Sequence, residues 1–405
     1  MKTVVGFTTY PSKFPIHGGQ RRVHAFADYY RSIGLHFESV CIFESQIYPN
    51  HEVGSYDLPL RSFESEYSNI PLIGDLLSGL YAAGQPRIVD HFVKVLLEKR
   101  PRAITLEQPF MWPLVKKLRE QADIRKIPLI YSSQNWEPSL KQQMLLSCGV
   151  DRKIAQLVED KIEEIEREAV AASDLIFAVS EDDAKIYSGM SPKTEVLVIR
   201  NGVDRPPKSF LAIPEEFEKR RYFFFVGSAY PPNIDGICSL VFDDGLFFVP
   251  PQKSFAICGG VSHGIFLDAR YQQFQAANSA RVSFFERISD EHLNALKASA
   301  HAFLLPIEFG GGSNLKTAEA LASGKWVIAT SVSMRGFEKF ANEPGVIIAD
   351  RPTSFRKAVM EVYRKPSLQL SADARAKRDL VYWDNCFNAL PRECRGFELL
   401  LSDKS

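Results

Sequence analysis

Residues 310–324 hold the side chains whose types and spacing point most directly to chemistry. The segment opens with a loop of small and polar residues: Gly310, Gly311, Gly312, Ser313 and Asn314. Leu315, Lys316 and Glu319 follow. Glycine backbone can approach a ligand closely, and the free N–H groups at the start of a helix attract anions. The segment therefore predicts a loop that binds a phosphate or diphosphate.

A helix is expected to follow this loop. It should begin near Ser313 or Asn314, either of which can cap the first turn, and end at Gly324 in the left-handed conformation. Lys316 and Glu319 would then share one helical face. The lysine can neutralise a phosphate oxygen, and the carboxylate can accept hydrogen bonds from the two adjacent hydroxyls of a ribose. An ordinary capped helix with an intrahelical Lys–Glu pair is the alternative.

A second group of candidate residues follows the first expected strand. Gly18 and Gly19 would let backbone approach a pyrophosphate, although a simple turn explains a glycine pair equally well. His17 precedes them, and Glu107 stands at the end of another expected strand. These two are the candidates for acid–base chemistry, with a structural role as the alternative for each.

The elements that must position these residues follow from the alternation of short apolar runs with longer amphipathic stretches, which predicts an α/β fold. Strands are expected over 4–7, 39–43, 103–106, 129–132, 175–179 and 196–199, and then over 222–226, 255–258, 282–284, 303–305, 326–329 and 346–348. Helices are expected between them. The chain after residue 353 is expected to be helical throughout.

The chain has 405 residues, which is long enough for two domains. A proline-rich and charged segment over 201–222 predicts a linker. We therefore expect a first domain over 1–204 and a second over 205–375. Residues 376–405 are expected to form a C-terminal helix that packs back on the first domain.

Composition excludes several classes of function. Basic and acidic residues each number 49, so no global field draws the chain to nucleic acid, and no nucleic-acid partner is expected. The cysteines form no C-x-x-C pair, and the acidic pairs at 182–183 and 243–244 lack partners, so no metal is expected. The N-terminal apolar run is too short for a secretory signal, and no stretch reaches the roughly 18 apolar residues of a membrane span. A cytoplasmic location is expected, with at most peripheral contact at the inner face of a membrane.

Segments spread over nearly the whole chain resemble the nucleotide-sugar glycosyltransferases of the GT-B fold, most closely the retaining glycosyltransferase family 4. They are residues 17–22, 131–137, 179–181, 199–204, 224–228 with 232–233, and 310–324, the last being the most specific. The resemblance implies two Rossmann-like domains that face a central cleft, with the acceptor on the first and the donor on the second. It also implies that Glu319 holds the donor ribose and that Gly18 and Gly19 lie near the donor diphosphate, across the cleft from Lys316.

The sequence departs from the family pattern at three places, one of them at Gln134 and Asn135, where the family often has a histidine. The family usually has a second glutamate eight residues before Glu319, where this chain has Gly311, and Glu308 is displaced by three residues. The family's arginine and lysine after the strand at 224–226 are also absent, and Lys316, Arg287 and the arginines at 21–22 are the candidate substitutes. The full donor-binding set is Gly18, Gly19, Arg287, Glu308, Gly311, Gly312, Ser313, Asn314, Leu315, Lys316 and Glu319.

The resemblance implies a hexosyltransferase-like enzyme of polysaccharide biosynthesis. It would move a sugar from a nucleotide sugar to a glycan, lipid-linked glycan or small-molecule acceptor, with retention and without a metal or cofactor. With retention, the leaving phosphate can itself help to deprotonate the acceptor; with inversion, His17 or Glu107 would be the general base. The alternatives are a nucleotide-sugar epimerase of the same fold and a non-catalytic nucleotide-sugar-binding subunit.

Overall fold

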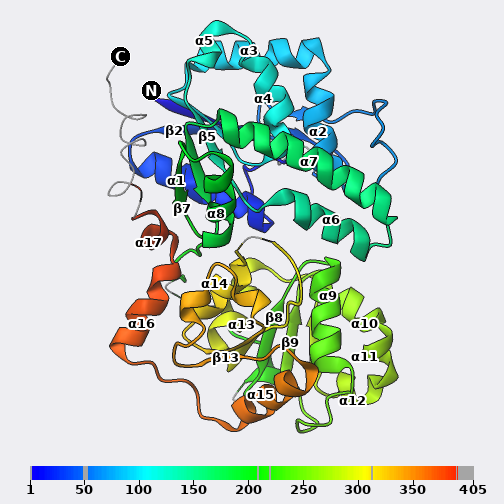
Figure 1. The fold of residues 1–405 in the computed structure, drawn as a ribbon. Coiled ribbons are helices and arrows are strands. Elements are labelled where there is room, and N and C mark those ends of the chain that lie inside the picture. Colours follow the sequence, from blue (N-terminus) through cyan, green and yellow to red (C-terminus); the bar gives the residue numbers. More distant parts are fainter. Residues whose placement is uncertain are drawn as a thin grey trace. The chain divides into compact units, whose positions relative to one another are not determined.

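The computed structural model describes residues 2–48, 53–207, 209–218, 220–311, 313–388 and 390. Contacts within the chain divide it into two compact units. The first runs up to Arg200 and takes in the described residues from Cys386 on, and the second is Asn201–Asn385. Each unit consists of a parallel sheet with helices packed on it (Figure 1). The predicted α/β class is confirmed in both.

The sheet of the first unit has seven strands in the described part of the chain. They are β1 (Thr3–Thr8), β2 (His36–Phe43), β3 (Leu58–Pro59), β4 (Ala103–Leu106), β5 (Leu129–Ser132), β6 (Leu175–Ala178) and β7 (Glu195–Val198). Their order is β3-β2-β1-β4-β5-β6-β7, and all pairs are parallel. The strands are nearly continuous apolar runs because helices cover the sheet, which buries them on both sides.

The helices of this unit follow the strands as crossover connections. They are α1 (Gly18–Ser32), α2 (Gly74–Ala83), α3 (Pro86–Lys99), α4 (Trp112–Leu118), α5 (Ala122–Arg125), α6 (Glu137–Ser147), α7 (Arg152–Ala172) and α8 (Glu181–Met190). A short helix, α17 (Trp383–Phe387), spans the limit between the units. Its Phe387 packs on Phe26 and Tyr29 of α1, with ring centroids 4.9 and 4.7 Å apart.

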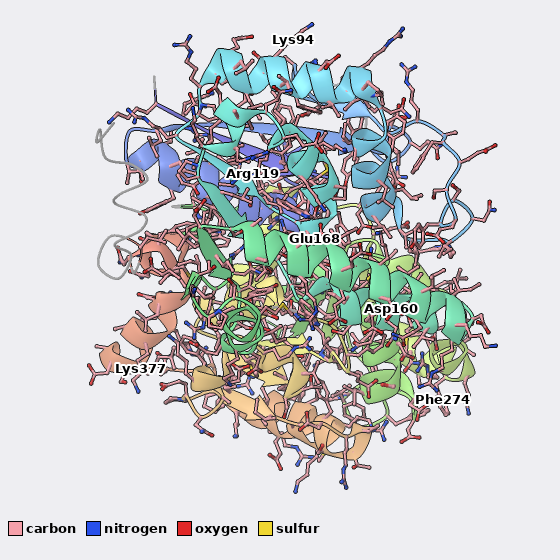
Figure 2. All side chains as sticks on the ribbon, turned by 45° about the horizontal axis from the view of Figure 1, so that its top comes forward. Lys94, Arg119, Asp160, Glu168, Phe274 and Lys377 are labelled. Carbon is pink, nitrogen blue, oxygen red and sulfur yellow. The ribbon has the colours of Figure 1, made fainter. Side chains whose placement is uncertain are left out.

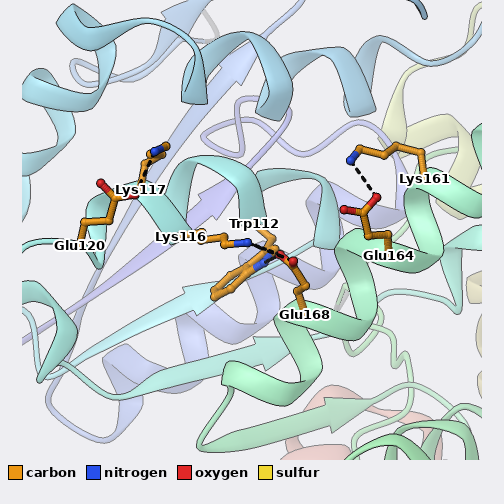
Figure 3. A network of polar contacts seen from close by, with 7 residues as sticks. All are labelled: Trp112, Lys116, Lys117, Glu120, Lys161, Glu164 and Glu168. Carbon is orange, nitrogen blue, oxygen red and sulfur yellow. Dashed lines mark hydrogen bonds and ion pairs between the residues drawn. The ribbon is translucent and has the colours of Figure 1, made fainter.

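Helix α7 shows how charge is divided between faces. Ile162, Ile165 and Ala169 are buried, as their spacing predicts, whereas Asp160 is exposed to solvent on the outer side of the helix (Figure 2). Glu168 accepts hydrogen bonds from the indole of Trp112 at 2.9 Å and from Lys116 at 2.8 Å (Figure 3). These bonds join α7 to α4, so the acidic face is a solvated structural surface.

The second unit repeats the arrangement with six strands among its described residues. They are β8 (Phe223–Val226), β9 (Phe255–Cys258), β10 (Val282–Phe285), β11 (Ala302–Leu305), β12 (Trp326–Ala329) and β13 (Val346–Ile348), in the parallel order β10-β9-β8-β11-β12-β13. The helices are α9 (Pro231–Ile237), α10 (Val261–Leu267), α11 (Ala269–Gln273), α12 (Gln275–Ser279), α13 (Asp290–Ser299), α14 (Leu315–Ala322), α15 (Pro352–Arg364) and α16 (Ala372–Arg378). Two separate apolar clusters pack around its strands, one including α15 and the other α14.

Both sheets share a topology that fixes where a ligand can bind. In each, the chain first adds strands on one side of the first strand and then continues on the other side, so the order reads 3-2-1-4-5-6, with a seventh strand at the end of the first sheet. Loops at the carboxyl ends diverge at this reversal, which lies between β1 and β4 and between β8 and β11. Gly18, Gly19 and Glu107 follow β1 and β4, and residues 310–324 follow β11.

All twelve expected strands are confirmed, several with ends shifted by one to three residues. The two-residue strand β3 was not predicted, because it is too short to show alternation. The expectation of continuous helix after residue 353 was wrong: residues 366–371 form no helix, since Pro366 cannot continue one. The predicted domain limits stay predictions, and of the C-terminal helix expected over 376–405, residues 389 and 391–405 lie outside the described part.

Within the described ranges, none of the helices is both long and apolar enough to cross a membrane. The expected linker contains, in its described residues, a single helical turn, Glu215–Phe217, and no β-strand.

Candidate functional site

The loop after β11 leads into α14 at the reversal of the second sheet. Helix α14 begins at Leu315, and the side chain of Asn314 caps it by accepting a hydrogen bond from the backbone N–H of Lys316 at 3.1 Å. Gly324, with φ +71°, follows its end in the left-handed conformation, as predicted. Gly310 also has positive φ, and Gly312 lies outside the described residues. The first turn of α14 thus follows a glycine-containing loop at the carboxyl edge of the sheet.

Ser313 does not cap the helix and instead fixes the loop. Its hydroxyl accepts a hydrogen bond from the backbone N–H of Asn201 at 3.2 Å, and its carbonyl accepts one from the Asn201 amide at 2.9 Å. Two bonds to the same residue hold the entry to α14 against the start of the unit. The N–H groups of the first turn are therefore preorganised for an anion.

Lys316 bridges α14 and α9. Its ammonium group donates a hydrogen bond of 2.7 Å to the side-chain oxygen of Asn233. Burial lowers the pKa of Lys316 to about 8, and the nearby carboxylate of Glu319 opposes this shift. At neutral pH the lysine is therefore mostly protonated, with little water around it. A desolvated cation of this kind interacts with a phosphate more strongly than an exposed one does.

Glu319 pairs with a lysine that the sequence did not single out. The ammonium group of Lys297, on α13, donates to Glu319 Oε1 at 2.8 Å, and the two side chains are 17% and 18% exposed. A carboxylate can accept about four hydrogen bonds, and the bond from Lys297 takes up only part of that capacity. Lys316 and Glu319 thus have partners on α9 and α13, which an isolated helix could not supply.

Glu308 and Arg287 lie differently. The carboxylate of Glu308 accepts a 2.5 Å hydrogen bond from the hydroxyl of Ser239, just after α9. Gly311, at the position of the family's upstream glutamate, carries no side chain. Arg287 is exposed and follows the edge strand β10, three strands away from β11 in the sheet order. The loop and α14 thus bring together Lys316, Glu319 and the helix start, but not Arg287.

Close backbone approaches explain two glycines that sequence reasoning missed. A Cβ on Gly236 of α9 would lie 1.9 Å from the carbonyl oxygen of Pro306, and one on Gly259 would lie 2.5 Å from the carbonyl oxygen of Gly227. The ends of β8, β9 and β11 are therefore packed backbone to backbone. This packing fixes the distance between α9 and the loop before α14.

A further cation lies beside the glycine loop. Arg335 follows the turn Val332–Met334, and its Nη2 atom lies 3.4 Å from the place a Cβ on Gly310 would take. Nothing in the local sequence indicates this proximity, because Arg335 belongs to the connection after β12. Arg335 thus lies beside the glycine loop, whereas Arg287 lies three strands away from it.

In the first unit, His17 is the N-cap of α1. Its Nδ1 atom accepts from the backbone N–H of Gln20 at 3.4 Å, and its Nε2 atom lies 3.2 Å from the hydroxyl of Tyr48. Burial, reinforced by the charge of Arg21, lowers its pKa to about 4. The imidazole is therefore neutral at pH 7 and a weak base, with both nitrogens engaged.

Gly19 is required by its surroundings. A Cβ there would lie 2.5 Å from both the Tyr10 hydroxyl and the Gln134 side-chain oxygen. The Gln134 amide in turn donates a hydrogen bond to the Tyr10 hydroxyl. The glycine is thus explained by packing against these side chains, while Gly18, the first residue of α1, is exposed.

Glu107 is completely buried at the end of β4. Its carboxylate accepts a 2.6 Å hydrogen bond from the hydroxyl of Thr105, and burial raises its pKa, with the charge of Arg22 acting in the opposite direction. Arg22 is itself buried and donates to the carbonyl of Ile199 at 2.8 Å. A carboxylate with no exposed surface does not reach a substrate, so charge compensation of Arg22 is the better account of Glu107.

In the described part of the chain, no three His, Cys, Asp or Glu residues are grouped to hold a metal ion.

Known structures share the fold over almost the whole chain. Sucrose-phosphate synthase from Thermosynechococcus elongatus is similar with a TM-score of 0.71 at 15% identity, over 95% of this chain and 96% of that one. HepE from Anabaena, solved with UDP and glucose, has a TM-score of 0.59 at 11% identity over 95% and 97%. The catalytic domain of starch synthase IV from Arabidopsis thaliana, bound to ADP and acarbose, has a TM-score of 0.58 at 12% identity over 94% of each chain. Identities this low establish the fold alone.

The sequence itself gives a narrower match. No curated protein matches it. Residues 220–365 match the family described as glycosyl transferases group 1, and this range includes Lys297, Lys316 and Glu319. The matched range runs from β8 to α15, so it contains the strand reversal and the loop described above. This part of the chain thus matches a glycosyltransferase family, and the chain as a whole has the GT-B fold.

Proposed function

We propose that the chain is a glycosyltransferase that transfers a hexose from a nucleotide-sugar donor held by the second unit, with retention and without a metal ion. The observation that carries the proposal is the arrangement around α14. The start of α14, the desolvated Lys316 and the largely buried Glu319 lie together where the strand order reverses. This combination offers sites for two phosphates and for a ribose.

Each donor group has a residue suited to it. Lys316 and the N–H groups of the first turn would bind the diphosphate, and Arg335 would add a second positive charge near Gly310. Glu319 would accept hydrogen bonds from the two ribose hydroxyls while Lys297 balances its charge. The fold relatives support this assignment, because HepE was solved with UDP and the starch synthase domain with ADP.

The chemistry requires stabilisation of the leaving nucleotide. As the anomeric C–O bond breaks, negative charge grows on the departing phosphate, where Lys316 and the helix start would stabilise it. His17 with a pKa of about 4 and the buried Glu107 are poorly suited to remove a proton from an acceptor hydroxyl. Both facts favour retention, in which the leaving phosphate takes up that proton. The acceptor, a glycan, lipid-linked glycan or small molecule, is assigned to the first unit.

Binding of nucleotides tests the donor site directly. We expect one of UDP, ADP and GDP to raise the melting temperature of the full chain, because a ligand that binds only the folded state stabilises it. Lys316→Met and Glu319→Gln should raise the Kd of that nucleotide at least about tenfold and so reduce the shift in melting temperature. The matched controls are Lys357→Met and Glu361→Gln, which remove an exposed pair on α15 of the same unit. No stabilisation by any of the three nucleotides would contradict the proposal.

Two further assays separate the alternatives. Incubation of the corresponding nucleotide sugar without an acceptor would yield an epimer if the chain were an epimerase, whereas a transferase leaves the sugar configuration unchanged. Nucleotide binding without transfer to any acceptor would favour a non-catalytic subunit. Transfer that chelator abolishes and magnesium restores would refute metal independence.

A further inference from the structure

A cavity of about 450 Å³ opens beside the carboxyl ends of β2 and β3 in the first unit. The turn after β2 forms one wall, residues 60–63 after β3 form another, and Leu77 of α2 adds to the lining. Small-molecule sites have volumes of about 300–1,000 Å³ and prefer the carboxyl edge of parallel sheets. The cavity therefore has the size and the place of a ligand site.

The turn after β2 links this cavity to the start of α1. The backbone N–H groups of Ile47 and Tyr48 donate to the carbonyl of Glu44 at 3.0 and 3.2 Å, which closes the turn. The hydroxyl of Tyr48 lies 3.2 Å from Nε2 of His17. The turn that lines the cavity is thus connected through Tyr48 to His17, the residue that caps α1.

Two charged side chains line the cavity, Glu44 and Arg61. In the described part of the chain, neither the carboxylate of Glu44 nor the guanidinium of Arg61 makes a hydrogen bond or an ion pair. Glu44 is half-buried and packs against Gly74, where a Cβ would lie 1.7 Å from its Oε1 atom. Burial raises the pKa of Glu44 against the charge of Lys141, which donates its hydrogen bonds instead to Asp75 at 2.6 Å and to the carbonyl of Leu72. A half-buried carboxylate with unused acceptor capacity is suited to hydroxyl groups.

The rest of the lining is mixed. Leu60, Phe63 and Leu77 are apolar and half-buried, and the ring of Phe63 lies 5.5 Å from that of Tyr81. Ser45 and Ser62 add hydroxyl groups. An aromatic face beside hydroxyls and charged groups fits a sugar ring, which has both an apolar C–H face and polar edges. An alkyl chain would instead leave the half-buried carboxylate of Glu44 desolvated without a hydrogen-bond donor.

We propose that this cavity binds a sugar ring of the acceptor, with hydroxyl groups donating to Glu44, Arg61 donating to ring or hydroxyl oxygens, and the C–H face lying on Phe63. The assignment as acceptor site rests on the transfer function proposed above. It narrows the acceptor from three classes to a saccharide, free or at the end of a longer molecule.

Saturation-transfer NMR on the full chain tests the site. The probes are glucose, galactose, mannose, N-acetylglucosamine, glucuronic acid, maltose and cellobiose, with 1-octanol as the aliphatic probe. We expect at least one saccharide to bind, and Glu44→Gln and Phe63→Ala to raise its Kd at least about tenfold. Arg61→Gln, at an exposed position, serves as a third variant that should leave the fold intact. The matched control is Glu120→Gln, which changes an exposed residue near the amino ends of the strands of the same sheet. This variant should bind the saccharide as the wild type does.

The outcomes separate this site from the donor site. If a nucleotide stabilises the chain but no saccharide binds, or if the variants bind saccharide normally, the acceptor site is refuted and the donor proposal stands. If a saccharide binds and no nucleotide does, the transfer proposal is refuted and the saccharide site stands. Binding of 1-octanol alone, lost in Phe63→Ala, would refute the saccharide assignment.

Discussion

The lowered pKa of Lys316 makes the affinity for a nucleoside diphosphate depend on pH above neutrality. With a pKa of about 8, half of the lysines are protonated at pH 8 and about one in eleven at pH 9. A bound diphosphate raises the pKa, because it favours the charged form. Binding above pH 8 therefore requires uptake of a proton, and the affinity should fall about tenfold for each further pH unit. The phosphates of the nucleotide do not change charge in this range, since a terminal phosphate has its second pKa at about 6.

Isothermal titration calorimetry at pH 7, 8 and 9 measures both consequences. The nucleotide is whichever of UDP, ADP and GDP stabilises the chain most. Titrations in two buffers with different ionisation enthalpies count the protons, and we expect about 0.5 per nucleotide at pH 8 and about 0.9 at pH 9. Lys316→Arg keeps the charge at every pH used, so its affinity should be almost constant. Lys316→Met should bind weakly and without proton uptake.

The free energy of unfolding gives an independent check without nucleotide. In the folded chain the pKa of Lys316 is lowered from 10.5 to about 8, so the unfolded chain binds more protons between these values. Stability from this residue should therefore rise as the pH increases from 8 to 10.5, by at most about 3 kcal/mol. Lys316→Met should lack this rise. A wild-type affinity that stays constant from pH 7 to 9, or a fall of equal size in Lys316→Arg, would refute the reasoning.

Three further substitutions and one control test the packing around the candidate sites. For each, the free energy of unfolding is measured by chemical denaturation. Gly236→Ala places a Cβ 1.9 Å from the carbonyl oxygen of Pro306, so α9 must shift; we expect a loss of about 1–3 kcal/mol and weaker nucleotide binding, and unchanged binding would contradict the role of α9. Gly19→Ala should also cost about 1–3 kcal/mol while leaving nucleotide binding intact if the second unit alone holds the nucleotide. Gly189→Ala is the control for both, since its Cβ meets open space in α8 and should stabilise by about 0.4–1 kcal/mol. Because burial raises the pKa of Glu107, its contribution to stability falls as the pH rises above about 4.5, and Glu107→Gln should remove that fall; equal pH profiles for variant and wild type would contradict it.

The sequence predicted the strands well and the contacts of the site poorly. Runs such as β11 are apolar throughout because they are buried, and burial leaves a pattern that can be read along the chain. The pairing of Lys297 with Glu319 joins residues 22 positions apart, and that of Asn233 with Lys316 joins residues 83 apart. No local pattern specifies such pairs, since they depend on how the helices pack.

The two candidate bases also show that local sequence does not determine the surroundings of a side chain. His17 and Glu107 were chosen because they follow strands, and both do lie at the carboxyl edge of the first sheet. Their pKa shifts depend on burial in the packed unit and on the charges of Arg21 for His17 and of Arg22 for Glu107. Residue type and position indicate a candidate base, whereas only the packed structure determines its basicity.

The return of the chain to its first unit has a consequence for synthesis on the ribosome. The strands and helices of that unit up to Arg200 are complete long before Phe387, which packs on Phe26 and Tyr29 of α1, has been made. At about 5–20 residues per second, this interval lasts on the order of ten to forty seconds. During that time the rings of Phe26 and Tyr29 on α1 lack their contact with Phe387. The nascent first unit therefore exposes aromatic surface on which aggregation can begin.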